Sequence, residues 1–222
     1  MKDTLARALP PLRPMLAAVT VGALLLFFFQ ESLLYHPTRP IHHTYDNQIG
    51  LQNPHQAGLQ YKNISIVTED NVTLRGWFMY TNRPRNDTPF PSEKKPTIVF
   101  MHENAGNIGL RLELFRHQIE RLNVNVLCMA YRGYSESDGK PSEAGLKMDA
   151  DAIIAFLKKP SRALRDAIHP DLVFLQGRSL GGAVAIYMGH RSPEVFKGLI
   201  IENTFTSISD MAEKILIPLR YF

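Results

Sequence analysis

The sequence is poor in cysteine and has no long run of charges of one sign. Its single cysteine, Cys128, excludes a disulfide within the chain. Because this residue lies in the apolar run 124–130, we predict that it is a small buried hydrophobe. The 25 basic residues exceed the 21 acidic ones by only four, and no basic patch is interleaved with aromatic residues. This balance argues against nucleic acid as a partner.

The sequence also lacks a regular pattern of metal ligands. Four histidines fall between residues 36 and 60, but their spacing is not that of a metal site on a helix or strand. Solvated loop histidines are the simpler interpretation. We therefore predict no metal and no organic cofactor.

Charge is absent from residues 14–30, a mostly apolar stretch between Arg13 and Glu31. A helix of this length reaches roughly 26 Å, close to the ~30 Å hydrocarbon core of a bilayer. We predict a membrane-spanning signal-anchor at residues 15–35. The alternatives are a cleavable signal peptide, for which no small-residue cleavage site follows the run, and a buried helix of a soluble protein.

The charges around this stretch predict its orientation. Lys2, Arg7 and Arg13 favour a cytoplasmic location for residues 1–14, which places the rest of the chain on the lumenal or extracellular side. Three N-glycosylation sequons fit that side, although each is a short and common pattern. They begin at Asn63, Asn71 and Asn86. Asn71 is alternatively a turn residue.

Residues 36–60 contain three prolines and are predicted to form an irregular tether, followed by one domain at 61–222. Segments 62–68 and 72–80 read as a β-hairpin, and 82–96 as a loop. Beyond them, short apolar runs at 97–101, 124–130, 172–175 and 198–201 alternate with helical patterns. Three of these helical patterns place the following residues on their faces: Leu112, Phe115, Ile119 and Leu122; Leu146, Ala150, Ile153 and Leu157; Val184 and Met188. A last helix is expected at 208–216. This alternation predicts an α/β fold with a mostly parallel sheet and helices on both faces.

The segment Gly177-Arg178-Ser179-Leu180-Gly181 lies between the apolar run 172–175 and a helical pattern. Gly-x-Ser-x-Gly between a strand and a helix is typical of the nucleophile elbow of α/β-hydrolases. Ser179 is then the candidate nucleophile, and the small residues beside it allow a sharp turn. The alternative is a glycine-rich loop in which Ser179 only caps the helix.

Four segments give a more specific resemblance: Asn-Ala-Gly-Asn-Ile-Gly at 104–109, Tyr-Arg-Gly-Tyr-Ser at 131–135, residues 177–186, and Glu-Asn-Thr-Phe at 202–205. With these motifs the chain, from about residue 33 onward, resembles the α/β-hydrolase domain-containing protein 13 family, the bud-emergence-type membrane-anchored serine hydrolases. The resemblance implies a serine hydrolase that acts on ester, thioester or amide bonds without a cofactor. A membrane anchor would suit an acyl-lipid or acylated-protein substrate. Oligomeric state is left open.

The resemblance also implies an oxyanion hole made by the backbone N–H groups of Leu180 and of the region Glu103–Asn104. This chain has His102-Glu103 where the family usually has His-Gly. Glu103 could place a negative charge that opposes the transition state, could have a raised pKa and stay neutral, or could point outward.

Three further residues are candidates for support of the site. We expect Arg132 to stabilise the fold by pairing with Glu136 or Asp138, and His102 to support its loop. Glu202 either faces the site or is a hydrogen-bonded structural carboxylate. His190 follows Ser179 on the same helix, but roughly 16 Å away, too far to take its proton.

The family places its acid and its histidine after two further strands, and the sequence shows neither. We therefore expect the hydrolase domain to lack its last two strands, to expose an apolar sheet edge at 198–201, and to be weak or inactive on its own. A non-catalytic, membrane-tethered binding or scaffold protein is the alternative function.

Overall fold

The chain forms two separate units in the computed structural model, which describes residues 12–80, 93–205 and 207. The units comprise residues 1–36 and 37–222. Among its described residues, the first contains the helix α2 (Leu12–Leu34), whose exposed side chains include Phe27, Phe28 and Phe29. No single helix in the described residues passes a length and hydropathy test for a membrane span, but the parts Pro14–Leu25 and Phe27–Leu34, bent by 48°, pass it together.

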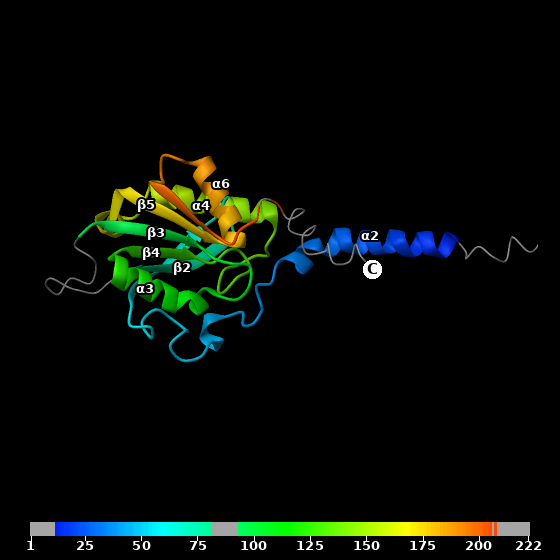
Figure 1. Ribbon diagram of the computed structural model, residues 1–222, viewed down its shortest axis with the longest axis horizontal. Coiled ribbons are helices and arrows are strands. Elements are labelled where there is room, and N and C mark those ends of the chain that lie inside the picture. Colours follow the sequence, from blue (N-terminus) through cyan, green and yellow to red (C-terminus); the bar gives the residue numbers. More distant parts are fainter. Residues whose placement is uncertain (1–11, 81–92, 206, 208–222) are drawn as a thin grey trace, which may run out of the picture. The chain divides into compact units, whose positions relative to one another are not determined.

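A six-stranded sheet dominates the second unit, in the order β1-β2-β4-β3-β5-β6 (Figure 1). The strands are β1 (Gln60–Val67), β2 (Thr73–Tyr80), β3 (Lys95–Met101), β4 (Asn125–Met129), β5 (Ile168–Arg178) and β6 (Gly198–Glu202). Strands β4, β3, β5 and β6 are parallel, and β1 and β2 join them as an antiparallel hairpin. The predicted hairpin and parallel sheet are therefore confirmed. Because the parallel strands run in the same direction, the segments that follow their carboxyl ends meet at one edge of the sheet.

The hairpin follows from the alternation of its sequence. Ile64 and Ile66 are buried, whereas Asn63 and Ser65, between and before them, are exposed. Its turn contains Asn71, whose φ of 63° lies in the left-handed region that asparagine tolerates. Asn71 therefore occupies a turn position.

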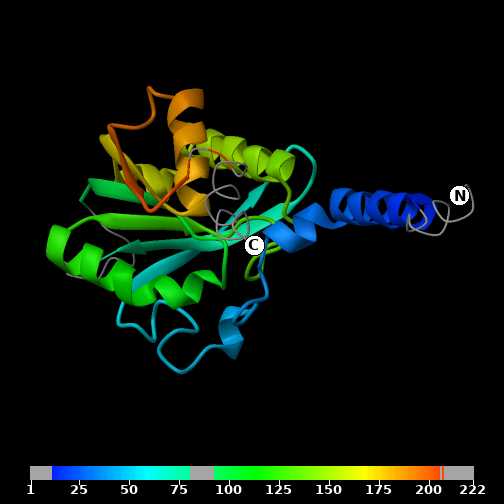
Figure 2. The same ribbon diagram turned by 45° about the vertical axis from the view of Figure 1, so that its right-hand side comes forward.

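Helices cover both faces of the sheet, as predicted (Figures 1 and 2). They are α3 (Leu112–Leu122), α4 (Glu143–Lys158), the short α5 (Arg162–Ala167) and α6 (Leu180–Arg191). Helix α3 contacts β2 and β4 on one face, while α6 contacts β3 and β5 on the other and also packs against α4. The active-site candidate, at the junction of β5 and α6, is thus part of the packed core.

The helical faces match the sequence pattern with one exception. Leu112, Phe115 and Ile119 are fully buried, but Leu122 is 62% exposed. Leu122 is the last residue of α3, directly before Asn123, which has a φ of 55° and turns the chain toward β4. The predicted face was therefore wrong at the final turn, where the helix no longer continues along the sheet.

The predicted tether is irregular but belongs to the second unit from Pro37 onward. A 3₁₀ turn at Thr44–Asp46 lies in it, and Thr44, Asn47 and Leu59 are buried. Its contacts extend to a second 3₁₀ turn, Ile108–Arg111, which leads into α3. This segment is therefore a structural part of the second unit.

Strand β6 forms one edge of the sheet, with Leu199 and Ile200 44% and 45% exposed. Cys128, in contrast, is fully buried, as predicted. Most of the predicted loop 82–96, the sequon at Asn86 and the helix expected at 208–216 lie outside the described residues.

Candidate active site

Ser179 occupies a single-residue turn between β5 and α6. Its backbone angles, φ 52° and ψ -119°, are rare for a residue with a side chain and cost conformational energy. The backbone N–H of Ser179 donates to the carbonyl oxygen of Glu202 at 2.9 Å. Its own carbonyl accepts a hydrogen bond from Oγ1 of Thr204 at 2.8 Å. The end of β6 and the residues after it therefore hold the turn in its strained conformation.

Glycines on both sides of Ser179 make this turn sterically possible. A Cβ on Gly177 would lie 2.2 Å from the carbonyl oxygen of Gly181. A Cβ on Gly181 would lie 1.9 Å from the carbonyl oxygen of Met101, at the end of β3. Both distances are far shorter than real contacts. The first turn of α6 is consequently seated directly on β5 and β3, which only glycine permits.

The close approach of α6 brings the segment after β3 to the same place. The Cβ that Gly181 lacks would also meet the carbonyl oxygen of His102 at 2.7 Å. Glu103 and Asn104 follow directly. Leu180 begins α6, so its N–H has no acceptor within the helix. The three residues predicted to supply the oxyanion hole thus lie on two segments that are in contact at Gly181.

Glu103 is bound to arginine in this segment. Its carboxylate accepts a hydrogen bond from Nε of Arg111 at 2.9 Å and lies 3.7 Å from Nε of Arg178. Burial alone would raise the pKa of the Glu103 carboxyl, but the charge of Arg111 and the hydrogen bonds around it lower the pKa below its usual value. The Glu103 carboxyl is therefore ionised, and the positive charge of Arg111 balances its negative charge. The alternative of a raised pKa is wrong. Arg111 also donates to the carbonyl of Ala105 at 2.6 Å and so fixes the loop.

His102 is buried beneath the same loop. Its Nε2 accepts a hydrogen bond from the backbone N–H of Tyr131 at 3.2 Å, and Nδ1 lies 2.8 Å from the carbonyl oxygen of Glu103. Because Nε2 accepts, the proton sits on Nδ1. Burial lowers the pKa of His102 to about 4. A neutral ring that joins two strand ends fits a supporting role for His102.

Arg132 stabilises the fold, but through partners other than those predicted. Its guanidinium donates to Asp70 at 2.7 Å and to Asp149 at 2.8 Å. Hydrogen bonds from Arg132 and Thr68 hold the pKa of Asp70 well below its usual range. The predicted partners bind elsewhere: Asp138 pairs with Arg75, and Glu136 accepts from Thr44. The correct partners lie far away in the sequence, on the hairpin turn and on α4, so proximity along the chain was the wrong criterion.

Glu202 and His190 have structural surroundings. Oε1 of Glu202 accepts a hydrogen bond from Nε2 of Gln176, which in turn accepts one from Gln118 at 2.6 Å. This polar row crosses from β6 to β5 and α3, consistent with the structural alternative for Glu202. His190 is exposed in the last turn of α6. Within the described residues, no hydrogen bond reaches Oγ of Ser179, and no group of three His, Cys, Asp or Glu side chains is placed to hold a metal ion.

Sequence reasoning missed the residues that fix the loop from outside. Asn107 is 1% exposed, and its side chain bonds to Asn47, to Gly109 and to the carbonyl of Ile41. Thr204, which binds the carbonyl of Ser179, was also missed as a single residue. Both fall inside the family-like motifs at 104–109 and 202–205, and that was the only signal available.

Strand order, helices on both faces and a strained serine after the fifth strand together define an α/β-hydrolase. A sequence model of the family described as Serine aminopeptidase, S33, matches residues 92–220. The chain is 39% identical to the α/β hydrolase domain-containing protein WAV2 of Arabidopsis thaliana over 92% of its length and 61% of that protein. It is 36% identical to the protein bem46 of Schizosaccharomyces pombe over 87% of its length and 60% of that protein.

An uncharacterized membrane protein of Saccharomyces cerevisiae, YNL320W, is 30% identical over 94% of this chain and 66% of that protein. The chain belongs to the serine aminopeptidase S33 family. Within it, the chain groups with the bud-emergence-type proteins that carry an α/β-hydrolase domain. It spans about 60% of the length of the first two of these relatives. Among solved structures, the Pyrococcus furiosus esterase Pf2001 superposes with a TM-score of 0.59 at 18% identity, over 85% of this chain and 65% of that one, which supports the fold.

Proposed function

We propose that this chain is the core of a membrane-anchored serine hydrolase that cleaves ester, thioester or amide bonds with Ser179 as its nucleophile. The observation that carries the proposal is the backbone of Ser179, held at φ 52° where β5 ends and α6 begins. Strain of this kind persists where surrounding structure enforces it, and it is a reason to suspect function. A serine that only capped a helix would not need both its N–H and its carbonyl held by hydrogen bonds to Glu202 and Thr204.

The proposed reaction is acyl transfer to water. Oγ of Ser179 bonds to the carbonyl carbon of the substrate, and the carbonyl oxygen becomes an oxyanion that the N–H groups of Leu180 and of the Glu103–Asn104 region stabilise. The leaving group departs with a proton, and water then releases the acyl group. The ion pair of Glu103 with Arg111 supports this proposal, because it removes the unpaired negative charge that would oppose the oxyanion.

The hydroxyl of Ser179 also needs a proton acceptor. The only histidine after it, His190, is exposed at the far end of α6. We therefore expect the 222-residue chain alone to turn over slowly. This expectation keeps a second candidate function in view, a membrane-tethered binding protein that retains the hydrolase fold.

Membrane attachment through α2 is part of the proposal. The exposed phenylalanines of that helix and the yeast relative that is named a membrane protein support it. An acyl-lipid or acylated-protein substrate would then be available at the same surface. If the second unit is lumenal or extracellular, Asn63 and Asn71, both exposed, are accessible for glycosylation. A shift in gel mobility after glycosidase treatment tests that topology, and no shift would contradict it.

A fluorophosphonate probe tests the nucleophile directly. We expect slow covalent labelling of the full chain that is lost in Ser179→Ala, with Ser65→Ala, at an exposed serine, as a control that stays labelled. Absence of labelling in a chain shown to be folded by circular dichroism would support the binding protein instead. Panels of lipid esters and of acylated peptides would then separate the two substrate classes.

A further inference from the structure

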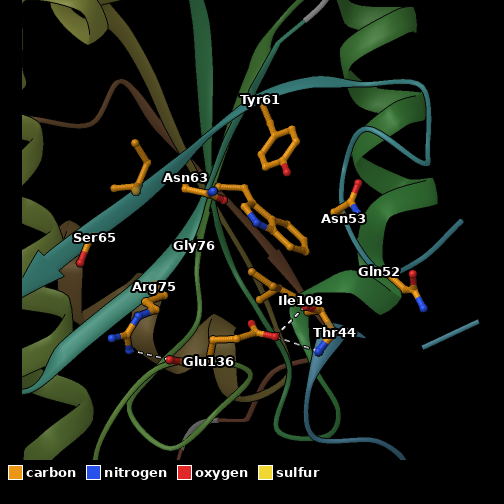
Figure 3. Close-up of a pocket in the computed structure, with 12 residues that line it drawn as sticks. Thr44, Gln52, Asn53, Tyr61, Asn63, Ser65, Arg75, Gly76, Ile108 and Glu136 are labelled. Atoms are coloured by element: carbon orange, nitrogen blue, oxygen red, sulfur yellow. Dashed lines mark hydrogen bonds between the residues drawn. The ribbon is translucent and has the colours of Figure 1, made fainter. Parts of the chain in front are cut away.

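A cavity of about 450 Å³ lies on the β1–β2 hairpin (Figure 3). None of the candidate catalytic or oxyanion residues lines it. Its floor is formed by one face of the hairpin, and its other walls come from Gln52 and Asn53 of the segment before β1, from Ile108 and from Glu136. Its volume lies in the range of small-molecule sites.

Two aromatic side chains, Tyr61, which is half-buried, and Trp77, which is 7% exposed, meet unused polar groups in this cavity. Asn63 and Trp77 are paired across the two strands, and Tyr61 lies two residues before Asn63 on the same face. The rings of Tyr61 and Trp77 are 6.3 Å apart and edge to face. Within the described residues, no hydrogen bond uses the amide of Asn63 or the polar atoms of Tyr61 and Trp77. These groups are free to bind a ligand.

The charged groups around the cavity are already engaged. Oε1 of Glu136 accepts hydrogen bonds from the backbone and hydroxyl of Thr44 at 3.0 and 2.6 Å. Nη1 of Arg75 donates to the carbonyl of Glu136 at 2.7 Å and to Asp138 at 2.8 Å. Arg75 is paired with the carboxylate of Asp138, and the carboxylate of Glu136 also lines the cavity, so the site has no excess positive charge for a phosphate or a carboxylate. Its chemistry favours a neutral ligand.

We propose that this cavity binds a neutral sugar ring. The C–H face of such a ring packs on the aromatic pair Tyr61 and Trp77. Its hydroxyl groups pair with the amide of Asn63, which both donates and accepts, and with Nδ2 of Asn53, whose Oδ1 already accepts from the backbone N–H of Gln56 at 3.1 Å. The sugar has two possible sources, a free saccharide or the first residue of a glycan attached to Asn63 itself. Both present the same ring to Tyr61, Trp77 and Asn53. In the second case Nδ2 of Asn63 is the point of attachment, so Asn63 holds the sugar covalently instead of through a free amide.

Trp77 is the only tryptophan of the chain, so its fluorescence reports on this cavity alone. The test uses the full chain from a host without N-glycosylation, in a detergent that has no sugar head group, titrated with N-acetylglucosamine. We expect a saturable change in Trp77 emission. Asn63→Ala should weaken binding by about fivefold or more, because one or two hydrogen bonds are lost. Asn71→Gly, which changes another exposed sequon asparagine and tolerates the positive φ, should bind as the wild type does.

The same chain from a glycosylating host separates the two sources. If the sugar is the glycan of Asn63, Trp77 is shielded from acrylamide, ignores added N-acetylglucosamine, and regains both responses after glycosidase treatment. If the sugar is free, the chain from both hosts binds it equally. The proposal is overturned if neither preparation shows a saturable or shielded Trp77, or if Asn63→Ala and Tyr61→Leu, shown to be folded, both respond as the wild type does. Ser179→Ala should leave the titration unchanged, which separates this result from the proposed hydrolase function.

Discussion

Asn47 and Asn107 bond to each other through both side-chain amides, each Nδ2 donating to the other Oδ1 at 2.8 Å, although 60 residues separate them. Both side chains are buried. Oδ1 of Asn107 also accepts from the backbone N–H of Gly109 at 3.0 Å, and Nδ2 of Asn47 donates to the carbonyl of Leu51 at 2.7 Å. The pair thus joins the segment before β1 to the loop that follows β3.

We predict that this pair is energetically coupled. Asn107→Ala should lower the free energy of unfolding by about 3 kcal/mol, because it leaves buried partners unsatisfied. In a double-mutant cycle with Asn47→Ala, the coupling energy should be about 1–3 kcal/mol. Urea unfolding of the full chain measures both quantities. Effects that simply add would show that the two amides act independently.

Two glycines of α6 provide a matched test of the elbow. Gly181→Ala should destabilise the fold by several kcal/mol, since its Cβ would lie 1.9 Å from the carbonyl oxygen of Met101. At Gly189, in the same helix, the nearest atom to an added Cβ is Cδ1 of Leu175 at 3.8 Å. Gly189→Ala should therefore be neutral or stabilise by up to about 1 kcal/mol. Equal thermal midpoints for the two variants would contradict the packing described for the elbow.

The buried ion pair of Arg132 should be costly to break from one side. Arg132→Met leaves the carboxylate of Asp149, which is 0% exposed, without its counter-charge. We expect a loss of about 3–5 kcal/mol in the free energy of unfolding. Arg116→Met, which removes an exposed pairing on α3, is the control and should change stability by less than about 0.5 kcal/mol. A small effect of Arg132→Met would mean that water or another cation reaches Asp149.

Stability should depend on pH through His102. Its pKa is lowered to about 4 by burial, whereas in the unfolded chain it is about 6.5. Between these values the unfolded state binds a proton that the folded state does not. The contribution is fully present above about pH 6.5 and is lost as pH falls toward 4, by as much as about 3 kcal/mol. In His102→Gln, urea midpoints should fall less over this interval, and identical pH profiles would show that His102 does not titrate in this way.

The elements of the fold could be predicted because their signals are local. Alternation gave the β1–β2 hairpin, and apolar runs bounded by turn residues gave the parallel strands. Glycine spacing around Ser179 located the elbow, since the steric demand involves neighbours in the sequence. The solvent exposure of Leu122 could not be predicted, because periodicity does not show where a helix stops covering the sheet.

The contacts that fix the site were harder to predict because they join distant segments. Arg132 binds Asp70 and Asp149, 62 and 17 residues away, rather than the nearby Glu136 or Asp138. The negative charge of Glu103 is balanced by Arg111, eight residues later in the 3₁₀ turn that leads into α3. The position of Glu103 in the motif does not indicate this pairing. Long-range pairing of this kind is set by topology, which no single motif encodes.

The N–H and the carbonyl of Ser179 are hydrogen-bonded to Glu202, the last residue of β6, and to Thr204, two residues beyond it. The helix behind the serine cannot relax the turn alone, since two hydrogen bonds would have to break with it. A shift of β6 by a fraction of an ångström would therefore be felt at the hydroxyl. A chain segment that pairs with β6 would therefore change the position of the Ser179 hydroxyl and, with it, the reactivity of this serine.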